Sequence, residues 1–120
     1  MIDLMFVGDV AAERAIATSI LRDLDFQVEE AHNALDALAR CARTLPHAII
    51  LDSDLGSAID LIGNLRLLPD ARRLRIVVAV ETFDLRMLAA ARIAGADDFL
   101  LKPFDRKVLS AVCSGLAKAA

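Results

Sequence analysis

Five short apolar segments recur along the chain, and a helical pattern follows each of them. The segments cover residues 2–7, 27–31, 48–51, 76–80 and 98–101. Residues 2–7, 48–51 and 76–80 are almost continuously apolar, which is typical of strands that helices cover on both faces. The segment 27–31 is more polar, so we expect it at an edge of the sheet.

The intervening stretches carry the 3.6-residue period of amphipathic helices, as Ile16, Ile20 and Leu24 illustrate. Two N-caps and one C-terminal stop are expected at Asn33, Asp105 and Gly95. Regular alternation of strands and helices predicts a parallel sheet with right-handed crossovers. The sequence therefore predicts an α/β protein, a three-layer α/β/α sandwich with five strands and five helices.

Composition narrows the class of protein. The 120 residues suit a single domain covering 1–120, and 57% of them are hydrophobic, enough for a sizeable core. A net charge of −3 disfavours nonspecific binding to nucleic acid, which requires clustered positive charge. Every apolar run is far shorter than the ~20 residues of a membrane span.

Two further features point to the cytoplasm. The first residues, MIDLMFVGD, include an acid and no basic flank, so they do not resemble a signal peptide. Cys41 and Cys113 lie far apart on predicted helices, which fits two buried thiols better than a disulfide or a metal site.

Charged side chains stand where the predicted strands end. Asp52 follows the buried segment 48–51, Asp9 follows the first strand, and Lys102 follows the last. Asp52 alone is also compatible with a turn residue or a helix N-cap. Because parallel strands bring their carboxyl ends to one edge, we expect these three side chains to form a functional site.

The chemistry of these residues narrows the site further. Clustered carboxylates suit a hard cation such as Mg²⁺, and an aspartate can act as a nucleophile that holds an acyl phosphate. A lysine opposite can pair with phosphoryl oxygens. Phosphoryl transfer mainly requires such a metal, nucleophile and cation in position.

Three segments now identify a resemblance that covers essentially the whole chain. FVGD, PHAIILDSDLG and AGADDFLLKPF are similar to motifs of the receiver domains of bacterial two-component response regulators. The resemblance implies a flavodoxin-like fold with strand order 2-1-3-4-5. It also implies a signalling domain that is not an enzyme.

The resemblance assigns a role to several positions. It implies that Asp52 is the phosphoacceptor, that Lys102 pairs with the phosphoryl group, and that Phe99 is the switch aromatic. It implies Mg²⁺ as cofactor, held by Asp9, Asp52 and the backbone carbonyl of Asp54. The peptide bond before Pro103 is usually cis in this family.

The chain departs from the family pattern at three positions. Gly8 replaces the acid next to Asp9, so we expect metal affinity to fall roughly 10–100-fold. Val80 replaces the switch Ser or Thr, unless Thr82 substitutes in a shifted loop. Glu81 replaces a small residue, and its charge about 5 Å from a phosphoryl dianion would cost on the order of 2–6 kcal/mol unless it turns into solvent.

These departures leave two functions open. The first is a phosphoaccepting receiver domain whose Asp52 is an inefficient acceptor. The alternative is a pseudo-receiver that works only as a protein-interaction module. A flavodoxin-like enzyme is a distant third, because the loop after residue 7 lacks the residues that cradle a flavin phosphate.

The same resemblance implies which kinds of protein this chain binds. A histidine kinase or phosphotransfer protein is the expected phosphodonor. The surface made by the fourth helix, the fifth strand and the fifth helix is expected to support homodimerisation or partner docking, since an apolar strip there suits an interface. Arg72, Arg73 and Arg75 lie at the opposite end of the sheet, where a solvated loop is expected.

Overall fold

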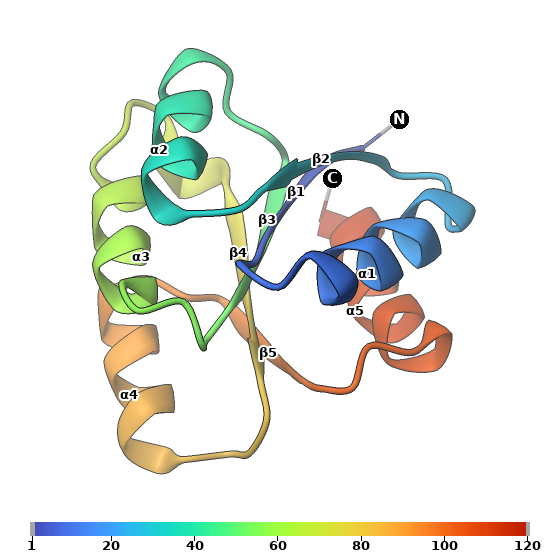
Figure 1. Cartoon of the computed structure of the whole chain (residues 1–120). Helices are drawn as coiled ribbons and strands as arrows, with labels where there is room; N and C mark the ends of the chain where they lie inside the picture. The colour runs from blue at the N-terminus through green and yellow to red at the C-terminus, as the bar shows by residue number, and fades with distance from the viewer. Residues whose placement is uncertain (1, 120) are drawn as a thin grey trace.

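The computed structural model describes residues 2–119, and the side chains of residues 2–116. Strands and helices alternate along this chain, as Figure 1 shows. The strands are β1 (Asp3–Val7), β2 (Gln27–Ala31), β3 (Ala48–Asp52), β4 (Arg75–Val80) and β5 (Asp98–Leu101). The helices are α1 (Ala11–Asp23), α2 (Ala34–Arg43), α3 (Ala58–Arg66), α4 (Leu85–Ala94) and α5 (Arg106–Ala119), with a short 3₁₀ helix η1 (Ala71–Arg73) before β4.

The strands form one parallel sheet in the order β2-β1-β3-β4-β5. This is the predicted order, and β2, the most polar strand, lies at an edge as expected. Helices α1 and α5 cover one face of the sheet, while α2, α3 and α4 cover the other (Figure 1). The flavodoxin-like three-layer sandwich is therefore confirmed.

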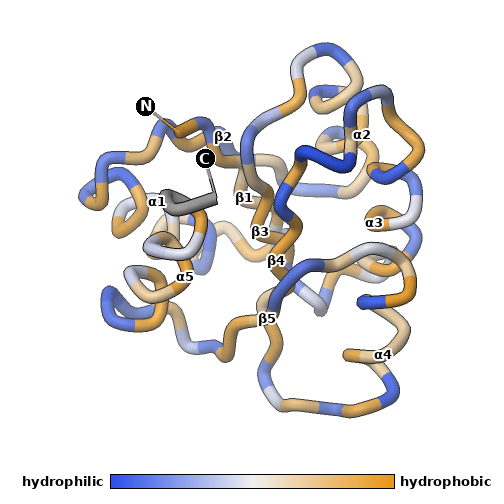
Figure 2. The backbone as a smooth tube through the Cα atoms, turned by 180° about the vertical axis from the view of Figure 1, so that it is seen from behind, coloured by the Kyte–Doolittle hydropathy of each residue, from blue (hydrophilic) through white to orange (hydrophobic). Residues whose placement is uncertain are grey.

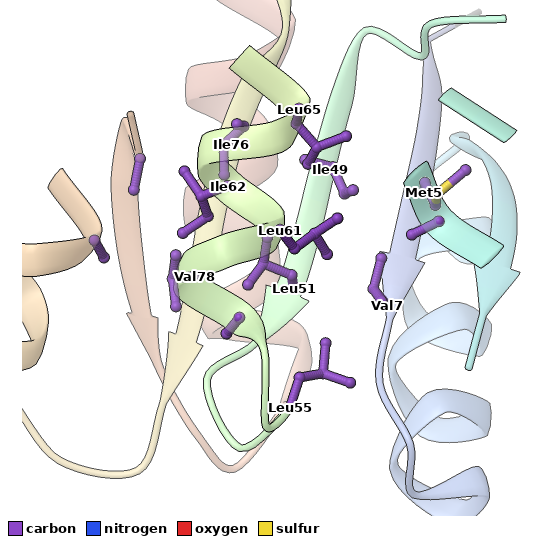
Figure 3. Close-up of a cluster of buried hydrophobic side chains, with 14 of the residues drawn as sticks. Met5, Val7, Ile49, Leu51, Leu55, Leu61, Ile62, Leu65, Ile76 and Val78 are labelled. Atoms are coloured by element: carbon purple, nitrogen blue, oxygen red, sulfur yellow. The ribbon is translucent and has the colours of Figure 1, made fainter. Parts of the chain in front are cut away.

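Each central strand is apolar throughout because its two faces enter two different cores. On β1, Met5 and Val7 join the cluster under α2, α3 and α4, which Figure 3 shows in close-up. The alternate residues Leu4 and Phe6 join the cluster under α1 and α5. The chain tube in Figure 2 is accordingly hydrophobic along the central strands.

The predicted helix caps are present. Asn33 accepts a hydrogen bond from the amide of Asp36 at 2.7 Å, and Asp105 accepts one from the amide of Val108 at 2.8 Å. Gly95 ends α4 with φ at 128°, a backbone conformation that favours glycine. These local signals positioned the helix ends correctly.

Three predicted boundaries were wrong by one residue. β1 begins at Asp3 rather than at residue 2. β3 extends to Asp52, which pairs with Ala79 of β4 and so closes the strand instead of following it. Arg75 is the first residue of β4 rather than part of a loop, because it pairs with Ala48 of β3.

The predictions about the two cysteines and about membrane-spanning segments can also be compared with the structure. Cys41 and Cys113 are buried free thiols on α2 and α5, as predicted. Across residues 2–119, none of the helices has both the length and the apolar character that crossing a membrane requires.

Candidate functional site

The carboxyl edge of the sheet brings together the acid and the base that the sequence singled out. Asp52 is the last residue of β3, and Lys102 directly follows β5. Both segments are anchored to β4, because the Ser53 amide donates to the Ala79 carbonyl at 2.9 Å and the Lys102 amide donates to the Val80 carbonyl at 2.8 Å. The strand pairing therefore fixes the backbone positions from which the two side chains extend.

Asp52 and Lys102 form a buried ion pair. The Lys102 Nζ lies 2.8 Å from Asp52 Oδ2, and the two side chains are only 2% (Asp52) and 7% (Lys102) exposed. The Asp54 amide donates to the other oxygen, Asp52 Oδ1, at 2.9 Å. Both carboxylate oxygens thus have a donor, which is the condition under which a buried charge is tolerated.

The pKa of Lys102 follows from this setting. Burial lowers the pKa of the ammonium, but the hydrogen bonds and negative charges of Asp52, and then of Asp54, outweigh burial and raise the pKa above its ordinary value of 10.5. Lys102 is therefore a fixed positive charge at neutral pH.

Two more carboxylates approach the same ammonium group. Asp54 Oδ2 lies 3.2 Å from Lys102 Nζ, and Glu13 Oε2 lies 3.7 Å from it. The sequence reasoning missed Glu13. Its place in the first turn of α1, which starts at this edge of the sheet shortly after Asp9, is the signal that points to it.

The lost acid at position 8 leaves a narrow space. A Cβ atom on Gly8 would lie 3.9 Å from the Asp52 Cβ and 3.2 Å from Phe6 Cε1, so position 8 borders the Asp52 side chain. The Arg14 Nη1 donates to the Gly8 carbonyl at 2.6 Å and the Arg14 side chain packs beside it. Asp9 is exposed, and within the described part of the chain its side chain makes no hydrogen bond or ion pair with Asp52 or Lys102.

The end of β4 offers no hydroxyl at the buried position. Val80 is buried in the core cluster under α2, α3 and α4. Glu81 and Thr82 are both exposed, and neither forms an ion pair or side-chain hydrogen bond with Asp52 or Lys102 in residues 2–119. Because Glu81 is exposed, solvent weakens the repulsion that its charge would exert on a phosphoryl group at Asp52 but does not abolish it.

Phe99 lies on β5, half-buried against the same core cluster as Val80. The guanidinium carbon of Arg92, on α4, lies 5.5 Å from the centre of its ring, a distance typical of a cation–π contact. The Lys102–Pro103 peptide bond is cis.

The residues at this edge supply only part of a metal site. Mg²⁺ requires near-octahedral oxygen coordination. Among the residues that the structure describes, no three His, Cys, Asp or Glu side chains are grouped to hold a metal ion. The magnesium ligands that the sequence analysis expects, Asp9, Asp52 and the Asp54 carbonyl, therefore stay a prediction, and they would hold Mg²⁺ only if water completed the shell.

Fold and site together define a flavodoxin-like signalling domain of the CheY type. A family model described as response regulator receiver domain matches residues 4–114. The chain belongs to this family, which serves two-component signal transduction. Receiver domains are generally non-enzymatic signalling modules that bind Mg²⁺ in the active site and interact with histidine kinases or phosphotransfer proteins.

Two curated relatives illustrate the range of the family. The chain is 27% identical over 114 residues to the chemotaxis protein CheY of Listeria monocytogenes, covering 93% of this chain and 96% of that one. It is 28% identical over 119 residues to the cyclic di-GMP phosphodiesterase response regulator RpfG of Xanthomonas campestris pv. campestris, covering 96% of this chain. The chain spans only 32% of the length of RpfG.

Solved structures agree on the fold. A putative response regulator from Chloroflexus aurantiacus matches with a TM-score of 0.86 and 28% identity, over 97% of this chain and 98% of that one. The chemotaxis protein CheY4 of Vibrio cholerae matches with a TM-score of 0.90 and 20% identity, over the same shares. The receiver domain of the sensor histidine kinase PA1611 of Pseudomonas aeruginosa, described with a magnesium ion coordinated in its active-site cleft, matches with a TM-score of 0.88 and 21% identity over 98% of both chains.

Proposed function

We propose that residues 1–120 form one receiver domain that accepts a phosphoryl group on Asp52, slowly, and passes the signal on through protein contacts. The observation that carries this proposal is the buried Asp52–Lys102 ion pair at 2.8 Å. It places a nucleophilic carboxylate beside a fixed positive charge that can pair with phosphoryl oxygens.

The reaction needs no base to take a proton from the nucleophile, because Asp52 attacks as a carboxylate. A carboxylate oxygen of Asp52 attacks the phosphorus, the bond to the leaving oxygen breaks, and the leaving group departs with the electron pair. The product is an acyl phosphate whose oxygens pair with Lys102. We propose that Mg²⁺ binds weakly through Asp9, Asp52 and the Asp54 carbonyl, where it would neutralise charge on the phosphoryl oxygens.

Three features make Asp52 a slow acceptor. Its side chain is 2% exposed, and both of its oxygens already accept hydrogen bonds. Val80 provides no hydroxyl for a phosphoryl oxygen, and Gly8 provides no second acid for the metal. Each feature raises the barrier or weakens metal binding without removing the nucleophile.

The second candidate is a pseudo-receiver that signals without phosphorylation. The same ion pair favours it, because Lys102 already has Asp52, Asp54 and Glu13 as partners and needs no phosphoryl group to be satisfied. In this case Phe99 and Val80 would form a fixed core rather than a switch.

The proposed docking face is formed by α4, β5 and α5. Leu85 and Ile93 of α4 are 81% and 88% exposed, and Leu101 of β5 is 38% exposed. Apolar side chains this exposed suit a phosphodonor, an output partner or a second copy of the chain. We place the signalling in the cytoplasm, where free thiols such as Cys41 and Cys113 persist.

Incubation with acetyl phosphate and Mg²⁺, followed by intact mass spectrometry, distinguishes the two functions. We expect slow addition of one phosphoryl group to the wild type and to Asp60→Asn, which changes an exposed aspartate on α3. Asp52→Asn should not be labelled. Absence of labelling in the wild type at high Mg²⁺ would leave the pseudo-receiver as the better account.

A further inference from the structure

A cavity lies at the opposite end of the sheet from Asp52. It has a volume of about 560 Å³ and is lined by the segments that enter β3 and β4, together with residues near both ends of the chain. Ligand pockets in proteins commonly measure roughly 300–1,000 Å³, so this cavity can hold a small organic molecule. The acceptor site does not use any of its lining residues.

Two arginines give this cavity positive charge. The Arg75 Nη1 lies 3.9 Å from Asp97 Oδ1, but Asp97 already pairs with Arg66 at 2.8 Å. Arg73, on η1, has no ion pair within the described part of the chain. Both guanidinium groups therefore retain donors for an anion, and guanidinium forks suit phosphate oxygens.

His47 adds a hydrogen-bond donor to the cavity. Its Nδ1 accepts a hydrogen bond from the Asp3 amide at 3.0 Å, so the neutral imidazole carries its proton on Nε2. The ring is thereby held in the tautomer whose other nitrogen can donate to a ligand.

The remaining lining explains why the ligand should be larger than inorganic phosphate. Leu45, Pro46 and Leu116 provide an apolar wall, and the Asp70 carboxylate provides an acceptor. A ligand with a phosphate, hydroxyl groups and a flat apolar ring matches all three parts of the cavity.

We propose that this cavity binds a nucleoside monophosphate. Its phosphate pairs with Arg73 and Arg75, a sugar hydroxyl donates to Asp70, and the base lies against the apolar wall. The proposal does not depend on phosphorylation of Asp52, because the two sites lie at opposite ends of the strands.

The four ribonucleoside monophosphates can be titrated by calorimetry in buffer that contains EDTA, with adenosine and inorganic phosphate as comparison ligands. We expect at least one monophosphate to bind with a Kd below about 1 mM, at least about tenfold more tightly than either comparison ligand. Arg73→Gln should weaken binding at least about tenfold, and so should Arg75→Gln.

Arg72→Gln is the matched control, because Arg72 neighbours Arg73 on η1 but does not line the cavity. It should change the affinity less than about twofold. In NMR spectra, the backbone amide signals whose chemical shifts change on ligand binding should belong mainly to residues 45–48 and 70–75. The proposal is overturned if none of the four nucleotides binds at roughly 5 mM, if Arg72→Gln loses as much affinity as the other two arginine variants, or if the shifts centre on residues 52–54 and 102.

Discussion

Lys102 places a positive charge beside Asp52, the proposed phosphoacceptor. Its ammonium lies within 3.7 Å of Asp52, Asp54 and Glu13. A phosphoryl group on Asp52 must therefore share this one positive charge with two carboxylates that take no part in the reaction. Because Asp54 and Glu13 are partly exposed, solvent weakens their effect but does not abolish it.

Removing either competing carboxylate should speed phosphorylation of Asp52. Glu13→Gln and Asp54→Asn each remove one negative charge near the incoming phosphoryl group, which is worth about 1 kcal/mol or less at a partly exposed site. We expect labelling by acetyl phosphate to become roughly 2–5-fold faster, measured by intact mass. Glu29→Gln, at an exposed position on β2, serves as control, and slower labelling of both site variants would contradict the competition.

The two thiols predict a loss of stability at alkaline pH. Burial raises the pKa of Cys41 from 9.0 to about 11, with a further contribution from the charge of Glu29, and burial raises the pKa of Cys113 to about 11 as well. Below pH 9 the thiols are protonated in both the folded and the unfolded state, so they do not change the stability. Between pH 9 and 11 the unfolded state loses its protons first, because the folded-state pKa is the higher one, and the loss of stability is complete above about pH 11. The free energy of unfolding therefore falls as pH rises from 9 towards 11.

Urea unfolding at pH 8 and pH 11 tests this expectation. The wild type should lose more free energy of unfolding between the two pH values than Cys113→Ala does, by up to roughly 2–3 kcal/mol. The titration of Lys102 is common to both proteins and cancels in the comparison. Equal losses in the two proteins would show that the Cys113 thiol is not desolvated in the folded state.

At the scale of the elements, the Arg66 side chain links α3 to the end of α4 and to η1. Arg66, the last residue of α3, donates to the Gly95 carbonyl at the end of α4 through Nε at 2.9 Å and Nη2 at 2.7 Å. Its Nη1 donates to the carbonyls of Ala71 and Leu74, at 2.6 Å and 2.7 Å. These bonds supply donors to the Gly95 and Leu74 carbonyls, which lie beyond the ends of α4 and η1, and give the Ala71 carbonyl a second donor beside the Leu74 amide.

Gly95→Ala should therefore destabilise the fold strongly. A Cβ at this position would lie 2.6 Å from the Arg66 Cγ, and the φ of 128° is itself strained for alanine. We expect a loss of at least about 2 kcal/mol in the free energy of unfolding.

Gly63→Ala is the control, because Gly63 lies within α3 and a Cβ added there would meet nothing within 4 Å beyond its own helix backbone. Alanine there should raise the stability by about 0.5–1 kcal/mol. The account of Arg66 would be wrong if the two substitutions had similar effects in urea unfolding.

The elements show which features a sequence can predict. The apolar runs, the 3.6-residue period and the caps at Asn33 and Asp105 are local, so the helices, strands and their approximate ends were predictable. The contacts of Glu13 with Lys102 and of Arg66 with Gly95 join positions far apart in the sequence. A local pattern places Glu13 in the first turn of α1, but it does not show that Glu13 reaches Lys102. The cavity around Arg73 and Arg75 was missed for the same reason, since it forms only when the segments entering β3 and β4 lie side by side.

At the scale of the whole molecule, metal binding should hardly stabilise the domain. A ligand that binds only the folded state adds RT ln(1 + [L]/Kd), which is about 0.4 kcal/mol when the ligand concentration equals Kd. With Gly8 in place of an acid, we expect 10 mM Mg²⁺, roughly equal to Kd, to raise the Tm by about 1–2 °C.

Gly8→Asp should increase this shift severalfold, because it restores a carboxylate beside Asp52. Each protein is compared with its own metal-free state, so the close approach of the new Cβ to Phe6 does not affect the comparison. A Mg²⁺-dependent shift in the wild type as large as that of Gly8→Asp would contradict weak metal binding.

The central claim is that Asp52 accepts a phosphoryl group slowly, and that the end of β4 limits the rate more than the metal does. Additional Mg²⁺ can offset the loss at Gly8 by mass action, but it cannot supply the hydroxyl that Val80 lacks or remove the charge of Glu81. Raising the Mg²⁺ concentration should therefore offset the defect at Gly8 but not the defects at Val80 and Glu81.

The direct test is the rate of mass gain with acetyl phosphate at saturating Mg²⁺, compared among the wild type, Gly8→Asp and the double variant Val80→Thr with Glu81→Ala. We predict that the wild type and Gly8→Asp label slowly, and that the double variant labels at least about tenfold faster, which corresponds to about 1.4 kcal/mol of barrier. If the wild type labels as fast as the double variant, the end of β4 does not limit the reaction, and the chain is a conventional phosphoacceptor.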